Sequence, residues 1–264
     1  MLRLLVTLTL WLLLITNQVV CFLPQSVWVK GRLMCGSDPA KGVLVKLIDA
    51  DNGPNPDDLL DSAYTDTDGY YNLKGDSSEW TNIDPELRIY HDCMDFGKPC
   101  QRKWVIRIPD KYIFDGTEPG KAMNLGTMNL EVELEDEDQD CDRQPHNLCF
   151  QGSDPDDELD VGFTDENGNF DLSGGTAEMT TIDPHLKVYH DCNDGKTPCQ
   201  RRWKFELPNH YIQLPTHRHH HHQQQQQQPP QYSSHEVHLK RKTLNIGVWN
   251  LEAILPAESH DCIH

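Results

Sequence analysis

The stretch IYHDCMDFGKPCQRKW, residues 89 to 104, decides the fold of this chain because it occurs twice. Ninety-nine positions further on, residues 188 to 203 read VYHDCNDGKTPCQRRW, and ten of the sixteen positions are identical. Both copies keep Tyr-His-Asp-Cys, a second cysteine after six intervening residues, and the final tryptophan. The chain therefore carries a tandem repeat, and we expect the matching parts of the two copies to fold in the same way.

The repeat extends on both sides of this stretch, although the two copies are unequal. Residues 55–73 match residues 154–172 at the same offset, and residues 121–134 match residues 242–255 at an offset of 121. The difference of 22 is an insertion that includes HRHHHHQQQQQQPPQ, residues 217–231, and we expect a disordered loop over 216–238. The second copy lacks a counterpart of residues 27–53. We therefore expect a complete domain over 22–142 and a partial one over 143–264, either a degenerate domain that borrows strands or a fusion of adjacent coding units.

The first residues predict export. Arg3 is followed by the apolar run LLVTLTLWLLLIT, residues 4–16, and then by small or polar residues, which is typical of a secretory signal peptide over residues 1–21. This run is shorter than the ~20 residues that a spanning helix needs, so we expect a secreted, extracellular chain that does not span a membrane. With 42 acidic against 23 basic residues, the net charge of −19 argues against a nucleic-acid partner.

Eight cysteines remain if Cys21 leaves with the signal peptide, and in an exported chain they indicate disulfides rather than zinc or catalytic thiols. Residues 87–108 predict a hairpin with two cysteines at its mouth. We therefore expect the local pairs Cys93–Cys100 and Cys192–Cys199. For the other four cysteines we favour the pairs Cys35–Cys141 and Cys149–Cys262.

Alternating apolar residues predict half-buried strands over residues 27–33, 43–48 and 130–135. The turn signals Ser-Asp-Pro, Asn-Gly-Pro, Thr-Asp-Gly and Glu-Pro-Gly separate the segments at the short spacing of an antiparallel sandwich, and little helix is expected. The sequence thus predicts an all-β protein.

Several motifs in fixed order give the chain a resemblance to the nematode transthyretin-like proteins. They are V-x-V-x-G-x-L-x-C from Val27, P-A-x-x-V-x-V-x-L from Pro39, T-D-x-x-G-x-[FY] from Thr65, Y-H-D-C-x6-C from Tyr90, and N-L-G-x-x-N-L from Asn124. The match covers nearly all of residues 25–141 and, incompletely, 149–262. The resemblance implies a seven- or eight-stranded transthyretin-like antiparallel β-sandwich, in two tandem units here. It also implies secretion and a role in extracellular binding rather than catalysis.

Three functions follow as alternatives. The first is a non-catalytic binding protein that holds a protein, a lipid head group or a small apolar ligand, with Arg102 and Trp104 as candidate surface residues on one strand face. The second is a 5-hydroxyisourate hydrolase, an enzyme of the same fold; its C-terminal Tyr-Arg-Gly-Ser is missing from both copies. The third is metal handling by imidazoles, which bind Zn(II), Cu(II) or Ni(II); the candidate ligands are His217, His219, His220, His221 and His222.

The sequence offers no further catalytic or cofactor signal. No Ser/His/Asp order and no phosphate-binding loop stands out, so no cofactor is expected. His91 and His190 each follow a strand tyrosine and precede a hairpin cysteine, and we expect each to make a structural hydrogen bond. Neither the ligand nor the oligomeric state is specified.

Overall fold

Strands form almost all of the regular structure of the chain, whose only helical elements among the described residues are two short 3-10 turns. The computed structural model describes residues 23–51, 56–139, 157–176, 181–213 and 242–262. The expected signal peptide and the histidine tract lie outside these ranges. None of the described helical turns is long and apolar enough to cross a bilayer.

The first sheet is built around the long strand β1 (Leu23–Cys35), whose alternating pattern buries Val27, Val29 and Leu33. Strand β5 (Tyr70–Glu79) pairs antiparallel along one edge of β1 from Leu23 to Arg32. The other edge takes β8 (Ile113–Asp115) and then β9 (Met123–Asn129), which runs parallel to β1. The short β2 (Asp38–Pro39) closes the end of β1.

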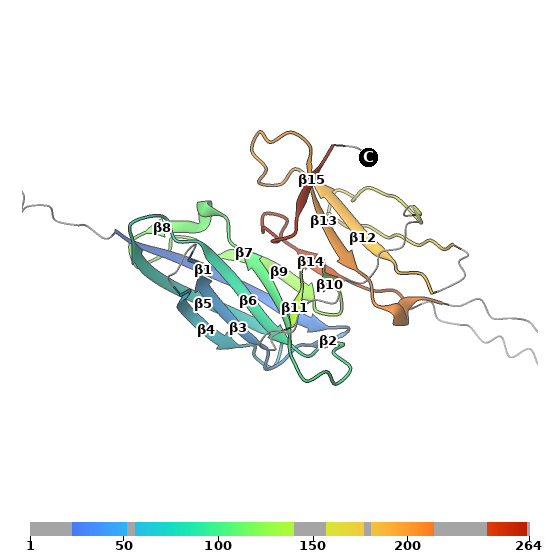
Figure 1. Cartoon of the computed structure of the whole chain (residues 1–264), viewed down its shortest axis with the longest axis horizontal. Coiled ribbons are helices and arrows are strands. Elements are labelled where there is room, and N and C mark those ends of the chain that lie inside the picture. Colours follow the sequence, from blue (N-terminus) through green and yellow to red (C-terminus); the bar gives the residue numbers. More distant parts are fainter. Residues whose placement is uncertain (1–22, 52–55, 140–156, 177–180, 214–241, 263–264) are drawn as a thin grey trace, which may run out of the picture.

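The second sheet of the first unit has the order β11-β7-β6-β3-β4 (Figure 1). Its strands are β3 (Leu44–Asp49), β4 (Asp58–Tyr64), β6 (Pro85–His91), β7 (Arg102–Arg107) and β11 (Asp138–Gln139). The hairpin expected over residues 87–108 is confirmed as β6–β7, in which His91 lies opposite Arg102. The two sheets form a β-sandwich.

The second unit supplies a smaller sheet. Strand β13 (Gln200–Glu206) pairs with β12 (His185–His190), β15 (Ser259–Asp261) and β10 (Glu133–Leu134), the last of which belongs to the first unit. Strand β14 (Gly247–Trp249) leaves the second unit and joins the first sheet beside β9. Within its described residues, the second unit has no strand that corresponds to β1 or β3.

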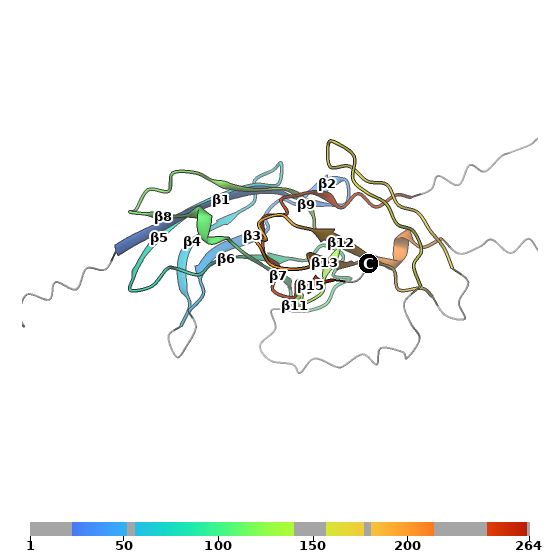
Figure 2. The same cartoon turned by 90° about the horizontal axis from the view of Figure 1, so that it is seen from above.

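The two units meet along β9, β10, β13 and β14 (Figures 1 and 2). The 3-10 turns Asp110–Tyr112 and Asn209–Tyr211 occupy equivalent places in the two copies. One hydrophobic core runs through both units: Trp104 and Ile106 of the first are buried in the same cluster as Trp203 and Phe205 of the second. The partial second unit is therefore completed by packing against the first.

The strand expected over residues 130–135 is wrong in its extent. Strand β9 ends at Asn129 and only Glu133–Leu134 is strand again. The Asn129 side chain accepts a hydrogen bond from the backbone N–H of Glu131 at 3.1 Å. This bond forms a turn, in which the N–H of Glu131 bonds to a side chain instead of to a neighbouring strand. Asn250 makes the same bond to Glu252 (3.0 Å).

Candidate functional site

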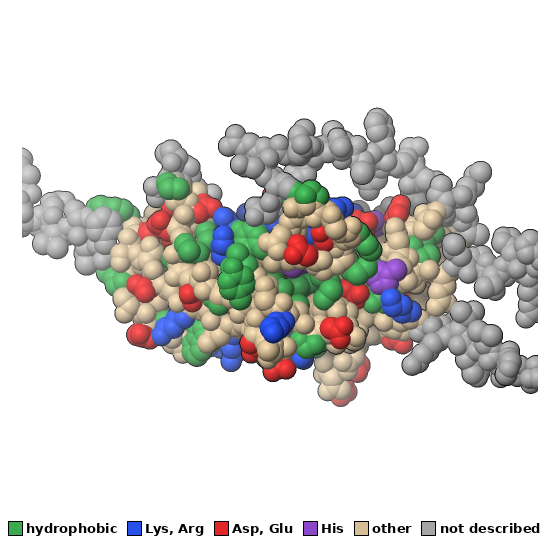
Figure 3. Space-filling view, turned by 90° about the horizontal axis from the view of Figure 1, so that it is seen from below, with side chains coloured by type: hydrophobic (Ala, Val, Ile, Leu, Met, Phe, Trp, Pro, Cys, Tyr) green, Lys and Arg blue, Asp and Glu red, His purple; other side chains and the backbone are tan. Residues whose placement is uncertain are grey.

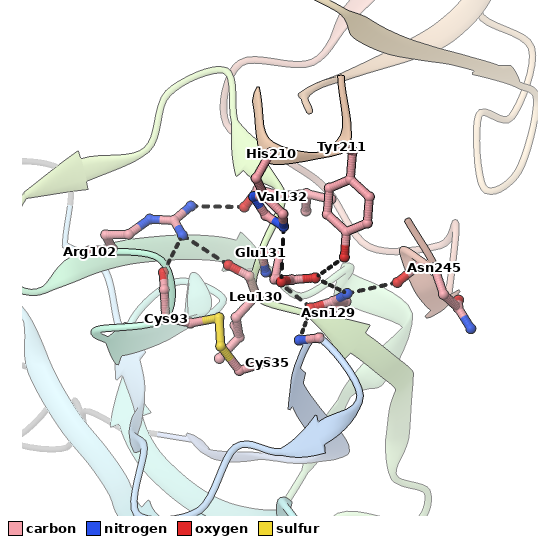
Figure 4. The surroundings of a disulfide bond; sticks show 11 residues. Cys35, Cys93, Arg102, Asn129, Leu130, Glu131, Val132, His210, Tyr211 and Asn245 are labelled. Atoms are coloured by element: carbon pink, nitrogen blue, oxygen red, sulfur yellow. Dashed lines mark hydrogen bonds and ion pairs between the residues drawn. A yellow bond between two sulfur atoms is a disulfide. The ribbon is translucent and has the colours of Figure 1, made fainter. Parts of the chain in front are cut away.

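Arg102, a candidate surface residue in the sequence, lies instead at the centre of a buried polar cluster (Figure 4). Its side chain is 4% exposed. The guanidinium donates to the backbone oxygens of Cys93 (2.6 Å), Leu130 (2.9 Å) and Val132 (2.8 Å). It also forms a two-pronged ion pair with Glu137. The planar fork of arginine suits this carboxylate geometry, so Arg102 ties together three loops and is not available to a ligand.

Trp104 is fully buried, which corrects the second surface candidate. Its indole N–H donates to Glu137 Oε2 at 2.8 Å. Its ring lies 5.5 Å from that of Trp249, which comes from the second unit. Arg102 and Trp104 do share one face of β7, as the alternation predicted, but this face is turned into the core.

The second unit repeats the whole cluster. Arg201 donates to the backbone oxygens of Cys192 (2.5 Å) and Leu251 (3.0 Å) and forms a two-pronged pair with Glu258. The Trp203 indole N–H donates to Glu258 Oε2 at 2.9 Å. Sequence reasoning missed both glutamates, although the signal was present: Glu-x-x-Asp-Cys occurs at Glu137 and again, 121 residues later, at Glu258.

The two histidines of the repeat pack edge-on against the tryptophans. The His91 ring centroid lies 5.3 Å from that of Trp104, and the His190 ring centroid lies 5.2 Å from that of Trp203. Burial, assisted by Arg102, lowers the pKa of His91 to about 3. Burial, assisted by Arg201, lowers that of His190 to about 4. Both imidazoles are therefore neutral at pH 7.

Only one of these histidines makes the expected hydrogen bond. His190 Nδ1 accepts the backbone N–H of Cys192 at 3.2 Å. The expectation is wrong for His91, because neither of its ring nitrogens has a hydrogen-bond partner among the described residues.

The disulfides differ from the expected local pairs. Cys35, at the end of β1, is bonded to Cys93 (Figure 4), so neither Cys93–Cys100 nor Cys35–Cys141 forms. The loop after β6 turns through left-handed conformations at Met94 and Phe96. These turns leave Cys93 buried against the end of β1 instead of facing Cys100.

In the second unit Cys199 is bonded to Cys262, which excludes Cys192–Cys199 and Cys149–Cys262. Cys192 is a free thiol, and it is the counterpart of Cys93, whose partner Cys35 has no counterpart in the second unit at the repeat offset. Cys100 is also disulfide-bonded. Cys141 and Cys149 lie outside the described residues, as do the candidate metal ligands His217 and His219–His222.

The contact between the units has an approximate twofold arrangement. In the β9–β14 pairing Gly126 lies opposite Trp249, and Gly247 lies opposite Met128. Positions 126 and 247 are equivalent in the repeat, and so are 128 and 249. Each contact is therefore made twice in opposite senses, as in an isologous dimer interface.

Side chains repeat this arrangement on either side of the strands. The Tyr211 hydroxyl donates to Glu131 Oε2 at 2.7 Å, and the equivalent Tyr112 hydroxyl donates to Glu252 Oε2 at 2.5 Å. Burial and the nearby carboxylate raise the pKa of each hydroxyl to about 12. Lys111 adds an ion pair to Glu252 at 2.6 Å.

The residues left exposed are apolar at several places. Residues 157–176 double back at the turn that follows Asp165 and contain no assigned strand; we call this segment the hairpin. On it Phe163 is 97% exposed and Val161 is 69% exposed. Phe170 is 40% exposed, whereas its counterpart Tyr71 in the first unit is only 4% exposed. On the face in Figure 3, acidic and basic side chains are interspersed with hydrophobic ones. The second unit thus exposes several apolar side chains on one segment.

Comparison with known proteins identifies the family. A family model described as the transthyretin-like family matches residues 30–109 and again residues 129–208, so the chain belongs to this family. Transthyretin-like protein 33 of Caenorhabditis elegans is 48% identical over 117 residues, which cover 44% of this chain and 82% of that protein. Transthyretin-like protein 5 of the same organism is 46% identical over 117 residues, 44% of this chain and 84% of that protein.

A solved structure also aligns with part of the chain. A 9R-lipoxygenase from Cyanothece matches with a TM-score of 0.23 and 20% identity, over 40% of this chain and 16% of that one. A likeness of this size carries no structural argument.

Proposed function

We propose that the chain is a secreted, non-catalytic binding protein and that the exposed hairpin, residues 157–176, holds an extracellular protein partner. The observation that carries the proposal is the exposure of Val161, Phe163 and Phe170 on this one segment. Contiguous apolar side chains exposed on a soluble domain can mark an interaction site. Figure 2 shows the hairpin as the yellow-green segment at the upper edge of the second unit.

The physical cause of this exposure is the missing start of the second copy. In the first unit β5 pairs with β1, and β4 pairs with β3. The hairpin 157–176 corresponds to β4 and β5 and keeps their turn, in which the Asp165 side chain accepts the backbone N–H of Asn169 at 2.8 Å. The described residues of the second unit include no counterparts of β1 and β3, so the hairpin offers apolar side chains that a partner's extended segment can cover.

The chemistry of the interior supports binding over catalysis. Arg102 and Arg201 are held in carboxylate pairs, and the buried histidines are neutral and packed on tryptophan. These arginine, histidine and tryptophan side chains are buried, so they stabilise the fold. Disulfides support export, since they persist in oxidising compartments.

A paired substitution tests the proposal. Phe163→Asp places a charge on the exposed hairpin, and Tyr64→Asp places one at the equivalent exposed position of the first unit. The full secreted chain and both variants are titrated against a panel of purified extracellular proteins and against phosphatidylcholine vesicles with and without phosphatidylserine. We expect at least one protein to bind the parent chain and Tyr64→Asp, and to bind Phe163→Asp at least tenfold more weakly.

Three results would contradict the proposal. Binding to vesicles alone would identify a lipid ligand, equal loss in both variants would remove the hairpin from the site, and turnover of 5-hydroxyisourate would identify an enzyme. The histidine tract as a metal-handling segment stays a prediction.

A further inference from the structure

Carboxylates gather at one end of the first sandwich, where β3, β4 and β5 terminate. Asp49 is the last residue of β3 and lies opposite Asp58, the first residue of β4. Asp51 follows Asp49 by two positions, and Glu79 is the last residue of β5. Carboxylate oxygens of Asp51, Asp58 and Glu79 all lie within 4.8 Å of one another.

This spacing suits one large cation. Ca²⁺ binds oxygen ligands at 2.3–2.6 Å, so two ligands of the same ion are at most about 5 Å apart. The donor set contains only carboxylate oxygens, which favour Ca²⁺ over Zn²⁺ or Cu²⁺, the ions preferred by imidazole and thiolate. Among the described residues, Asp58 and Glu79 make no ion pair with a basic side chain. Burial, and then the charges of Asp49, Asp51, Asp58 and Asp84, raise the pKa of Glu79.

Asp49 provides an observation that does not depend on the clustering itself. Asp49 is 1% exposed; Oδ1 accepts the backbone N–H of Asp84 at 2.7 Å, and Oδ2 has no hydrogen-bond partner in the part of the chain that the structure describes. A buried carboxylate oxygen without a partner costs free energy, on the order of a few kcal/mol. Asp49 lies opposite Asp58 in the β3–β4 pairing, so the two side chains share a face of the sheet. Burial raises the pKa of Asp49, and the charges of Asp51 and Asp58 are among the further causes that raise it.

We propose that Asp51, Asp58 and Glu79 bind one Ca²⁺ ion, and that the buried carboxylate of Asp49 lies behind the ion and adds to its attraction. A cation at this place offsets the repulsion among the carboxylates. It also attracts the Oδ2 atom of Asp49 electrostatically. Binding fixes the ends of three strands at one point. The ion is therefore a ligand that stabilises the first unit.

The repeat supplies a matched control. The counterpart of Asp58 in the second unit is Asp157, which is exposed. At the same offset the positions of Asp49 and Asp51 are taken by Leu148 and Phe150, so the second unit has only part of the donor set. Removing the charge of Asp157 changes the net charge of the chain as Asp58→Asn does, without touching the proposed site.

The experiment uses the full secreted chain with Tb³⁺ and Ca²⁺ as probes. Trp80 follows Glu79 directly, so bound Tb³⁺ should luminesce on tryptophan excitation, and Ca²⁺ should displace it. We expect one such site per chain. The double variant Asp58→Asn/Glu79→Gln should bind at least tenfold more weakly, and Asp157→Asn should bind as the parent does.

Thermal unfolding provides the second readout and guards against misfolding. Without Ca²⁺ the double variant should unfold at the same temperature as the parent or higher, because it has lost mutual repulsion. Addition of 10 mM Ca²⁺ should raise the unfolding temperature of the parent and of Asp157→Asn only. Unchanged affinity in the double variant, an equal loss in Asp157→Asn, or no Ca²⁺ uptake at 10 mM would each overturn the proposal.

Discussion

Burial of ionisable side chains without partners is the dominant theme at the scale of single residues. His91 packs edge-on against Trp104 and close to the charge of Arg102, which keeps its imidazole neutral inside the fold. In the unfolded chain the same group titrates near its ordinary value of ~6.5. Folding therefore excludes a proton that the unfolded chain takes up over the pH range between these values.

We predict that this difference makes the fold sensitive to acid. The contribution of His91 to stability is fully present above pH ~6.5 and is lost as the pH falls toward about 3, since the unfolded state then binds more protons. Between pH 7 and pH 4 the loss amounts to roughly 3 kcal/mol for this one group. His91→Phe keeps an aromatic ring against Trp104 and should lose less stability over this range. Urea unfolding at both pH values measures the difference, and identical losses in parent and variant would refute the assignment.

Cys192 is a second residue whose state the structure decides. Its counterpart Cys93 is bonded to Cys35, whose position at the repeat offset is taken by Leu134, and Cys192 is a free thiol. We predict that Cys192 alone among the described cysteines reacts with N-ethylmaleimide without reduction. Peptide mapping should place the label on Cys192 and, by the repeat relation to Cys199–Cys262, should find Cys100 joined to Cys141. The variant Cys192→Ser should take up no label. A disulfide at Cys192 would contradict the prediction.

At the scale of elements, the contact between β9 and β14 depends on two glycines at equivalent positions. Gly126 and Gly247 have φ of 89° and 90°, a region that side chains avoid. A Cβ on Gly126 would lie 2.1 Å from the backbone oxygen of Val248, and one on Gly247 would lie 2.0 Å from that of Thr127. The absence of side chains thus allows the two units to approach at backbone distance.

We predict that Gly126→Ala and Gly247→Ala destabilise this contact beyond the cost of the backbone conformation. Gly42→Ala is the matched control, because Gly42 also has positive φ (75°) but has open space around it. The control should lose about 1–2 kcal/mol of unfolding free energy, and the two contact variants should lose clearly more. Chemical denaturation of the three variants makes the comparison. An equal loss of unfolding free energy in all three variants would show that the close approach of β9 and β14 does not require glycine at these positions.

At the scale of the whole molecule, one core and one polar arrangement hold two unequal units together. Trp249 of the second unit contacts both Trp104 and Trp203, with ring centroids 5.5 Å and 6.1 Å apart. Phe205 lies 5.1 Å from the same ring. The second unit has no counterparts of β1 and β3 within its described ranges, and the first unit covers its apolar residues along the contact. The hairpin 157–176 lies away from that contact and remains exposed, which makes it the candidate binding surface.

The sequence determined the features that depend on neighbours along the chain. Alternation at Val27, Val29 and Leu33 predicted β1, and the repeated Tyr-His-Asp-Cys stretch predicted the β6–β7 hairpin and the family. It also predicted that Arg102 and Trp104 share a face. These patterns are local, because the two-residue period of a strand and the turn residues that end it involve residues that are adjacent in the sequence.

The tertiary structure alone decided which distant groups meet. It placed the shared face of Arg102 and Trp104 in the core, paired Cys93 with Cys35 rather than with Cys100, and brought Tyr112 to Glu252. Such contacts depend on which strands become neighbours and on the direction in which a loop turns. A strand with one apolar face can turn that face toward either a core or a partner, and only the tertiary packing around β7 settled this: Arg102 and Trp104 meet Glu137 of the same unit, and Trp104 also meets Trp249 of the second unit.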